Sequence, residues 1–190
     1  LQSRLGITFI FVTHDQEEAM SMSDRIAIML DGHVEQLADP ETVYEHPSSA
    51  FLAGFIGRNN FWTGTATTNG VQADDGTVFV VSKPEELVPA GQASLAAVRP
   101  ECVVLHSADP GVSHNAVAGD VASVSHFGDV LQYVVRTPGR TILVLTPRAS
   151  AVRLQTGDDV WATWNADDVY MFSADQAELV LAEPAAEGDS

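Results

Sequence analysis

The fold of the N-terminal part is decided by the stretch Ile7-Thr8-Phe9-Ile10-Phe11-Val12-Thr13-His14-Asp15-Gln16-Glu17-Glu18-Ala19-Met20. Its first half, residues 7–12, is a continuous run of apolar, β-branched and aromatic residues, which is typical of a strand buried on both faces of a parallel sheet. The second half favours a helix, with Asp15 as its cap and Glu18 as the partner residue of a capping box. We therefore expect His14 at the carboxyl end of a strand, where open α/β sheets bind ligands.

The residues that follow predict a hairpin and two short helices. Residues 25–37 form two apolar runs around Asp31-Gly32, a dipeptide that is typical of a two-residue hairpin turn. One helix is expected to start at Asp39-Pro40, where Asp caps it and Pro takes the first helical position. A second helix is expected over residues 50–56, closed by Gly57.

From Asn59 onward the helical periodicity disappears, and short runs rich in Val, Thr and aromatic residues alternate with Gly, Pro and Asp. Many short strands at this spacing predict a small all-β barrel or sandwich. We expect a first domain over residues 1–57, a second over residues 58–176 and an acidic, disordered tail over residues 177–190. The expected strands cover residues 61–67, 77–81, 93–98, 102–105, 117–125, 131–137, 141–145, 160–164 and 169–172.

Composition narrows the class of function. The formal net charge is −17, from 26 acidic against 9 basic residues, and this field argues against nucleic-acid binding. No apolar run approaches the ~18–20 residues that span a bilayer, so we expect no direct membrane insertion. The start, Leu1-Gln2-Ser3-Arg4, lacks the layout of a signal peptide and an initiator Met, and we expect the chain to be cut from something longer. Cys102, the single cysteine, is interpreted as a buried or half-buried small hydrophobe.

The stretch Phe11–Met20, followed by Ser23-Asp24-Arg25-Ile26-Ala27-Ile28-Met29, resembles the switch-loop region of ABC transporter ATPases. It is most similar to importer subunits of the sugar, polyamine and ferric-ion type. The later segments Asp31–Gln36, Val43–Pro47 and Phe51–Gly57 resemble the closing hairpin and helices of the same ATPase domain. Further on, four segments resemble the TOBE domain that is appended to these importers: Arg99-Pro100-Glu101, Gly119-Asp120-Val121, His126-Phe127-Gly128 and Gly157-Asp158-Asp159-Val160.

The resemblance implies a fold in two parts. Residues 1–57 are expected to be an α/β remnant of an ABC ATPase domain, that is, the C-terminal part of its nucleotide-binding domain. Residues 58–176 are expected to form an all-β, OB-like TOBE barrel that regulates the protein or helps two subunits to pair. A remnant that starts inside a sheet exposes apolar residues such as Ile7–Val12, so we expect pairing with another chain or poorly ordered first residues.

The resemblance also gives His14 a role as the catalytic, ATP-binding residue that contacts the γ-phosphate and helps to place the attacking water. Phosphoryl transfer depends on positioning and charge stabilisation, and a histidine at a strand end can donate a ring N–H to a phosphate oxygen. A metal site at His14, Asp15, Glu17 and Glu18 is the alternative, but no second histidine stands at ligand spacing, and we expect no metal ligand. Structural or solvent-facing roles are expected for the other histidines, His33, His46, His106, His114 and His126.

A phosphate-binding loop of the form G-x-x-x-x-G-K-[ST] needs a lysine followed by a hydroxyl residue. The only lysine, Lys83, is followed by Pro84, so the loop is missing from these 190 residues. In the family, this loop and the catalytic glutamate precede the switch histidine. We expect the parent protein to be an ABC-type ATPase that uses ATP and Mg²⁺, and these residues alone to bind neither and to be inactive.

The favoured function is the ATP-hydrolysing subunit of an ABC import transporter of polyamine (spermidine/putrescine) type, with ferric ion, sugar or another solute as alternatives. The expected partners are membrane permease subunits and a second copy of the chain. These partners imply a cytoplasmic location, peripheral on the inner face of the cell membrane. The competing hypothesis is a standalone TOBE-based module that binds a small ligand or dimerises and has no ATPase activity.

Two features of the second domain are open to both functional and structural interpretations. Arg99 could bind an anion, although pairing with an acid such as Glu101 is its more common fate. Aromatic residues could line a pocket, although such side chains more often form a core or a dimer interface. The aromatic residues concerned are Trp62, Tyr133, Trp161, Trp164 and Tyr170.

Overall fold

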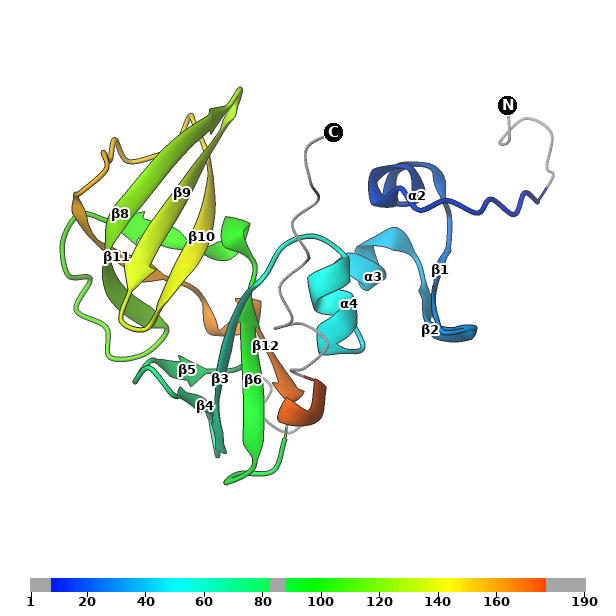
Figure 1. The fold of residues 1–190 in the computed structure, drawn as a ribbon, viewed down its shortest axis with the longest axis horizontal. Coiled ribbons are helices and arrows are strands. Elements are labelled where there is room, and N and C mark those ends of the chain that lie inside the picture. Colours follow the sequence, from blue (N-terminus) through cyan, green and yellow to red (C-terminus); the bar gives the residue numbers. More distant parts are fainter. Residues whose placement is uncertain (1–7, 83–87, 177–190) are drawn as a thin grey trace. The chain divides into compact units, whose positions relative to one another are not determined.

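The computed structural model describes residues 8–82 and 88–176, which divide into two compact units, one ending at Ser48 and one beginning at Ser49 (Figure 1). The boundary predicted from the sequence follows residue 57. The predicted and the observed boundaries differ because one helix packs with the second unit. The predicted disordered tail, residues 177–190, lies outside the described residues. Among the described helices, none combines the length and the apolar character that crossing a membrane requires.

The described residues of the first unit, 8–48, contain two helices and a hairpin: α2 (Gln16–Met22), β1 (Ile26–Leu30), β2 (His33–Ala38) and α3 (Pro40–Glu45). The hairpin turn is confirmed, with positive φ angles of 49° at Asp31 and 81° at Gly32 that suit a primed two-residue turn. The start of α3 is confirmed as well, because the carboxylate of Asp39 accepts from the backbone N–H of Thr42 at 2.9 Å. Ile26 and Ile28 of β1 are buried.

The strand predicted over residues 7–12 is wrong for this structure. Residues 8–12 form no strand, and the exposed fractions of Phe9, Ile10, Phe11 and Val12 are 61%, 94%, 64% and 91%. A strand buried on both faces needs neighbouring strands for its backbone and covering side chains for its faces. The described residues of the first unit supply neither, so the α/β character expected of this unit is not seen. The expected exposure of apolar residues, in contrast, is seen.

The second unit begins with helix α4 (Ala50–Phe55), which the hydroxyl of Ser49 caps by accepting from the N–H of Leu52 at 3.2 Å. Ala50 and Ala53 pack against Leu95, Ala97 and Phe172, all in strands of this unit. This contact explains why the helix belongs with the β-rich unit. It also brings the end of the helix close to the Arg99-Pro100-Glu101 element, because Arg99 donates to the carbonyl of Ile56.

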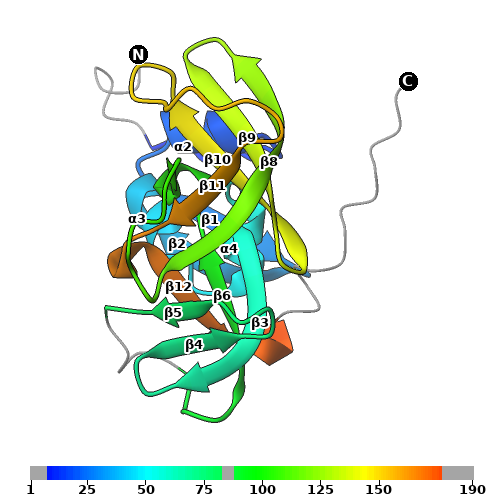
Figure 2. The same ribbon diagram turned by 90° about the vertical axis from the view of Figure 1, so that its left-hand side faces the viewer.

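Ten strands of the second unit form two antiparallel sheets of five strands each (Figure 2). In one sheet the order is β12-β6-β3-β4-β5, and in the other it is β10-β9-β8-β11-β7. Each predicted run corresponds to a strand, and only β4 was missed, because its first residue, Gly70, read as part of a turn. The strands are β3 (Asn60–Thr67), β4 (Gly70–Ala73), β5 (Val78–Val80), β6 (Ala93–Val98), β7 (Val104–His106), β8 (Ala116–Phe127), β9 (Val130–Thr137), β10 (Arg140–Pro147), β11 (Asp159–Thr163) and β12 (Val169–Ser173).

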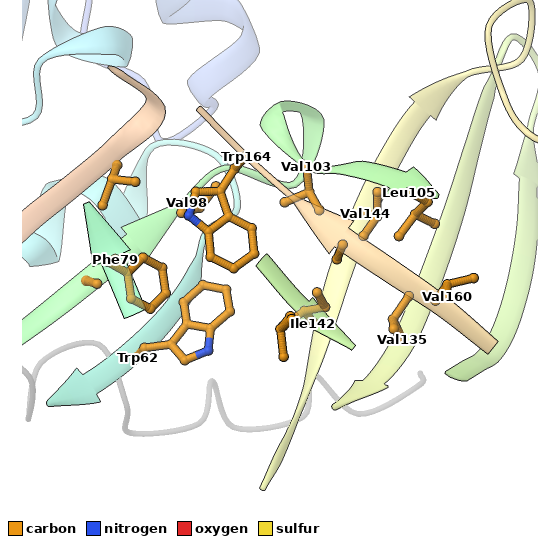
Figure 3. Packing of buried hydrophobic residues seen from close by; sticks show 14 of the residues in the cluster. Trp62, Phe79, Val98, Val103, Leu105, Val135, Ile142, Val144, Val160 and Trp164 are labelled. Carbon is orange, nitrogen blue, oxygen red and sulfur yellow. The ribbon is translucent and has the colours of Figure 1, made fainter. Parts of the chain in front are cut away.

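The two sheets share one hydrophobic core, whose aromatic end is shown in Figure 3. Trp62, Phe79 and Trp164 lie with their ring centroids 5.0–5.4 Å apart, which is within the range of favourable aromatic pairs. Branched aliphatic side chains such as Val135 and Val160 continue the core between the sheets. The all-β, barrel-like character predicted for this part of the chain is therefore confirmed.

Two asparagines join the sheets, because their side-chain carboxamides form the hydrogen bonds that the backbone of a neighbouring strand would otherwise form. Asn60 of β3 donates to the carbonyl of Leu143 at 2.8 Å and accepts from its N–H at 2.7 Å. Asn115 does the same at Val80, accepting from the N–H at 2.8 Å and donating to the carbonyl at 3.1 Å. Both asparagines are buried, so these bonds satisfy polar groups that would otherwise be costly inside the protein.

Replacement of Asn60 by Ala should lower the free energy of unfolding of the chain by about 2 kcal/mol, because Leu143 loses the partner of both its backbone groups. Urea denaturation followed by circular dichroism measures this change. Asn165→Ala serves as the control, since Asn165 is exposed and bonds only to Asp168 at the surface, and it should change stability by less than about 0.5 kcal/mol. Equal midpoints for the two variants would contradict this role of Asn60.

Cys102 ends the short 3-10 helix η2 (Pro100–Cys102) and is half-buried, as the sequence predicts. Burial raises the pKa of its thiol to about 12, with further contributions from the negative charges of Asp168 and Glu101. Because the thiolate is the reactive form, this environment makes the cysteine a poor nucleophile. The interpretation of Cys102 as a packing residue is thus supported by its surroundings.

Alkylation of Cys102 by iodoacetamide at about pH 8 should be more than about 100-fold slower in the folded chain than in urea, where the thiol has a pKa of about 8.5. Mass spectrometry of timed samples measures the two rates. Asp168→Asn removes one of the charges that raise the pKa and should accelerate the folded-state reaction. Folded and unfolded rates within tenfold of each other would exclude the raised pKa.

Candidate functional site

The segment around His14 is held in shape by three local hydrogen bonds. The N–H of Asp15 donates to the hydroxyl oxygen of Thr13 at 2.9 Å, and this hydroxyl donates in turn to the carboxylate of Glu18 at 3.1 Å. The N–H of Glu18 donates to the carboxylate of Asp15 at 3.1 Å, which confirms Asp15 as the cap of α2. The predicted capping box differs in one respect: Glu18 accepts from Thr13 rather than from the backbone of Asp15.

His14 itself lies on the bend between Thr13 and Asp15, immediately before the helix, and its side chain is exposed. Within the described part of the chain its ring makes no hydrogen bond or ion pair. Both ring nitrogens are therefore available to an external partner such as a phosphate oxygen, but that contact stays a prediction. Residues 8–82 and 88–176 hold no group of three or more side chains able to bind a metal ion.

The second unit carries a groove of about 600 Å³ between the β8–β9 hairpin and the segment that follows β10. We call it the hairpin groove. Its floor includes Tyr133, a buried residue of β9 whose hydroxyl donates to the carbonyl of Val152 at 3.0 Å. The groove is lined by Val124, His126, Leu131, Tyr133, Arg148, Ala151, Val152, Arg153, Leu154, Gln155 and Thr156.

The register of the hairpin explains which side chains reach this groove. Val124 pairs with Tyr133, and His126 pairs with Leu131, so these four residues lie on one face of the two strands. The bond from Tyr133 to Val152 then fixes the later segment above that face. Residues distant in sequence thereby form one surface.

Arg99 does not face an external anion. It is buried, donates through Nη1 to the carbonyl of Ile56 at 3.1 Å, and its guanidinium carbon lies 5.8 Å from the ring centroid of Tyr170. Because Ile56 caps the end of α4, Arg99 joins this helix to the sheet. Its position indicates a structural role.

The aromatic residues separate into two groups. Trp62 and Trp164 belong to the core, which agrees with the structural interpretation of these aromatic residues, and Trp161 is half-buried on β11. Tyr133 alone of the group lines the hairpin groove. Sequence reasoning did not single out Arg148 and Arg153, although two arginines in a segment without acids were an available signal in so acidic a chain.

Comparison with known proteins agrees with this architecture. Residues 96–172 match the family model of the TOBE domain. Among solved structures, the cytoplasmic molybdate-binding protein ModG, in a molybdate-bound crystal form, has a similar fold, with a TM-score of 0.51. This similarity covers 67% of the present chain and 99% of that chain at 16% sequence identity, so it concerns the fold alone.

Curated relatives carry the name spermidine/putrescine import ATP-binding protein PotA. The protein from Rubrobacter xylanophilus is 42% identical over 179 residues, which are 87% of this chain and 45% of that protein. Those from Thermobifida fusca and Pseudomonas aeruginosa are 37% and 38% identical, and cover 90% and 83% of this chain. The chain thus spans less than half the length of these relatives. Residues 96–172 therefore match the TOBE domain model, and the chain is similar to the C-terminal portion of these import ATP-binding proteins.

Proposed function

We propose that the chain is the C-terminal part of the ATP-hydrolysing subunit of an ABC import transporter, and that the imported solute is a polyamine. The observation that carries this proposal is the 42% identity, across 87% of the chain, with a relative named as a spermidine/putrescine import ATP-binding protein. Residues 1–57 would be the end of the nucleotide-binding domain, and residues 58–176 the TOBE domain. Membrane permease subunits and a second copy of the subunit are its proposed partners, on the inner face of the cell membrane.

His14 is the residue that we assign to the reaction. Its exposed ring stands before the capped N-terminus of α2 and has no competing partner among the described residues, which suits a donor to the γ-phosphate of ATP. Mg²⁺ bound with ATP in the complete subunit would neutralise phosphate charge, and it has no ligand set among the described residues. What this segment contributes is position: Thr13, Asp15 and Glu18 hold the backbone on either side of His14.

The exposed segment Phe9–Val12 supports the same proposal. Four consecutive large apolar side chains that are 61–94% exposed are unusual on a finished protein surface. In a nucleotide-binding domain this segment would be a strand of the central sheet, flanked by strands of the same domain. The residue at its end, His14, would then stand at the edge of the sheet where the nucleotide binds.

His14→Ala in the complete subunit, assembled with its permease, should reduce ATP hydrolysis by about 100–1000-fold, because one donor to the transferred phosphate is lost. ATP binding should persist, since the phosphate-binding loop is unchanged. His33→Ala is the matched control: His33 is also exposed, lies in the same unit at the start of β2, and should leave the rate unchanged. Hydrolysis by His14→Ala within tenfold of the unaltered protein would remove His14 from the reaction.

Uptake of labelled spermidine by cells that carry the transporter tests the proposed solute separately. Uptake should depend on this subunit and should fall in the His14→Ala strain but not in the His33→Ala strain. Import of ferric ion or a sugar in place of spermidine would refute the polyamine assignment and leave the ATPase assignment standing.

The 190 residues alone should not hydrolyse ATP, because the phosphate-binding motif G-x-x-x-x-G-K-[ST] does not occur among them. Release of inorganic phosphate from ATP, measured with the purified chain, checks this expectation. The complete subunit provides the positive control under the same conditions. Turnover by the 190 residues at a comparable rate would show that their catalytic parts had been misread.

A further inference from the structure

The hairpin groove has the dimensions of a small-molecule site. Its volume of about 600 Å³ falls within the ~300–1,000 Å³ of typical ligand pockets. One wall is the hairpin of β8 and β9, and the other is the segment 148–156 that leaves β10. All of these residues lie within the second unit, so the groove is complete without the first.

The charge of the groove is opposite to that of the chain. Arg148, Arg153 and His126 line it, and no Asp or Glu does, although acids outnumber bases by 26 to 9 in the sequence. Two other arginines, Arg136 and Arg140, are bound in ion pairs with acids. By contrast, the side chains of the two groove arginines have no hydrogen-bond or ion-pair partner within residues 8–82 and 88–176.

The backbone beside these arginines adds further donors. The N–H groups of residues 151–154 donate to no acceptor in the described part of the chain, whereas the next N–H, of Gln155, is bound to the carboxylate of Asp158 at 2.7 Å. The carbonyl of Val152 is already occupied by Tyr133. Unused amide donors next to cationic side chains are the elements from which proteins build anion sites.

Beside the polar residues Gln155 and Thr156, the groove also has an apolar part. Val124, Ala151 and Leu154 are partly buried hydrophobic residues that pack against the main core, and Leu131 is buried. A free inorganic anion uses none of this surface, whereas an organic anion can place a nonpolar part against it. The composition of the groove therefore favours a ligand with a charged end and an apolar body.

We propose that the hairpin groove is a binding site for a small organic anion, whose carboxylate or phosphate group is held by Arg148 and Arg153 and by the free N–H groups of residues 151–154. A nucleic acid does not fit, since its many phosphates would also meet the acidic remainder of the surface. A small anion senses mainly the nearest charges, because salt screens the others beyond about 8 Å. The proposed site does not rest on the assignment of ATP hydrolysis or of the transported solute.

Amide nuclear magnetic resonance spectra of the full chain, titrated with citrate and separately with phenyl phosphate, test the proposal. Saturable shifts are expected for the amides of residues 151–154 with at least one of the two probes, and the pair tells a carboxylate site from a phosphate site. Sodium chloride should weaken the binding because the contact is ionic. Spermidine, a cation, should not shift these amides.

The double variant Arg148→Gln/Arg153→Gln should weaken the binding of the active probe more than tenfold, while the rest of its spectrum shows that the fold is retained. Arg136→Gln is the control, because Arg136 lies on β9, the strand that also carries the groove residue Tyr133, but is not itself among the groove residues, and its replacement removes one of the chain's positive charges elsewhere. Its affinity for the probe should equal that of the unaltered chain. The proposal is overturned by the absence of saturable shifts with both anions, or by equal affinity in the double variant.

Discussion

The architecture of the second unit depends on the side-chain carboxamides of two asparagines, each of which forms hydrogen bonds with the edge strand of a sheet. In each five-stranded sheet the outer strands have unpaired backbone groups, and such edges are open to unwanted pairing. Asn60 of the other sheet forms hydrogen bonds with the edge strand β10. Asn115, which directly precedes β8 of the opposite sheet, forms hydrogen bonds with the edge strand β5. A carboxamide carries a donor and an acceptor side by side, so it can replace one residue of a neighbouring strand. Each sheet thus supplies the partner for an edge of the other.

The same junction carries the charged contacts of the interior. Arg140, at the start of β10, donates to the carboxylate of Asp75 at 3.0 Å and to the carbonyl of Phe61, and its guanidinium carbon lies 5.4 Å from the ring centroid of Trp62. A charge removed from water requires such a set of partners. Because the sheets are joined in this way, the strands β8 and β9 of the hairpin are held in place at this junction.

Local patterns were sufficient to predict the strands of the second unit except β4, the turn at Asp31-Gly32 and the helix caps at Asp15 and Asp39, because each depends on residues that are neighbours in sequence. The inter-sheet bonds of Asn60 and Asn115 were beyond such reasoning, since their partners are 83 and 35 residues away. The hairpin groove was missed for the same reason: the positions of Arg148 and Arg153 beside the hairpin follow from packing.

The first unit shows the opposite situation, in which a strong local signal is not realised. Residues 8–12 have the composition of a buried strand, but composition supplies no hydrogen-bond partner, and the segment stays exposed. The bonds of Thr13, Asp15 and Glu18 order only the chain around His14. Under the proposed function, the missing constraint is the sheet of a nucleotide-binding domain, which would bury Phe9–Val12 and bring His14 to its edge. Local capping therefore shapes the histidine segment, and placing it against a nucleotide depends on contacts that the described residues do not make.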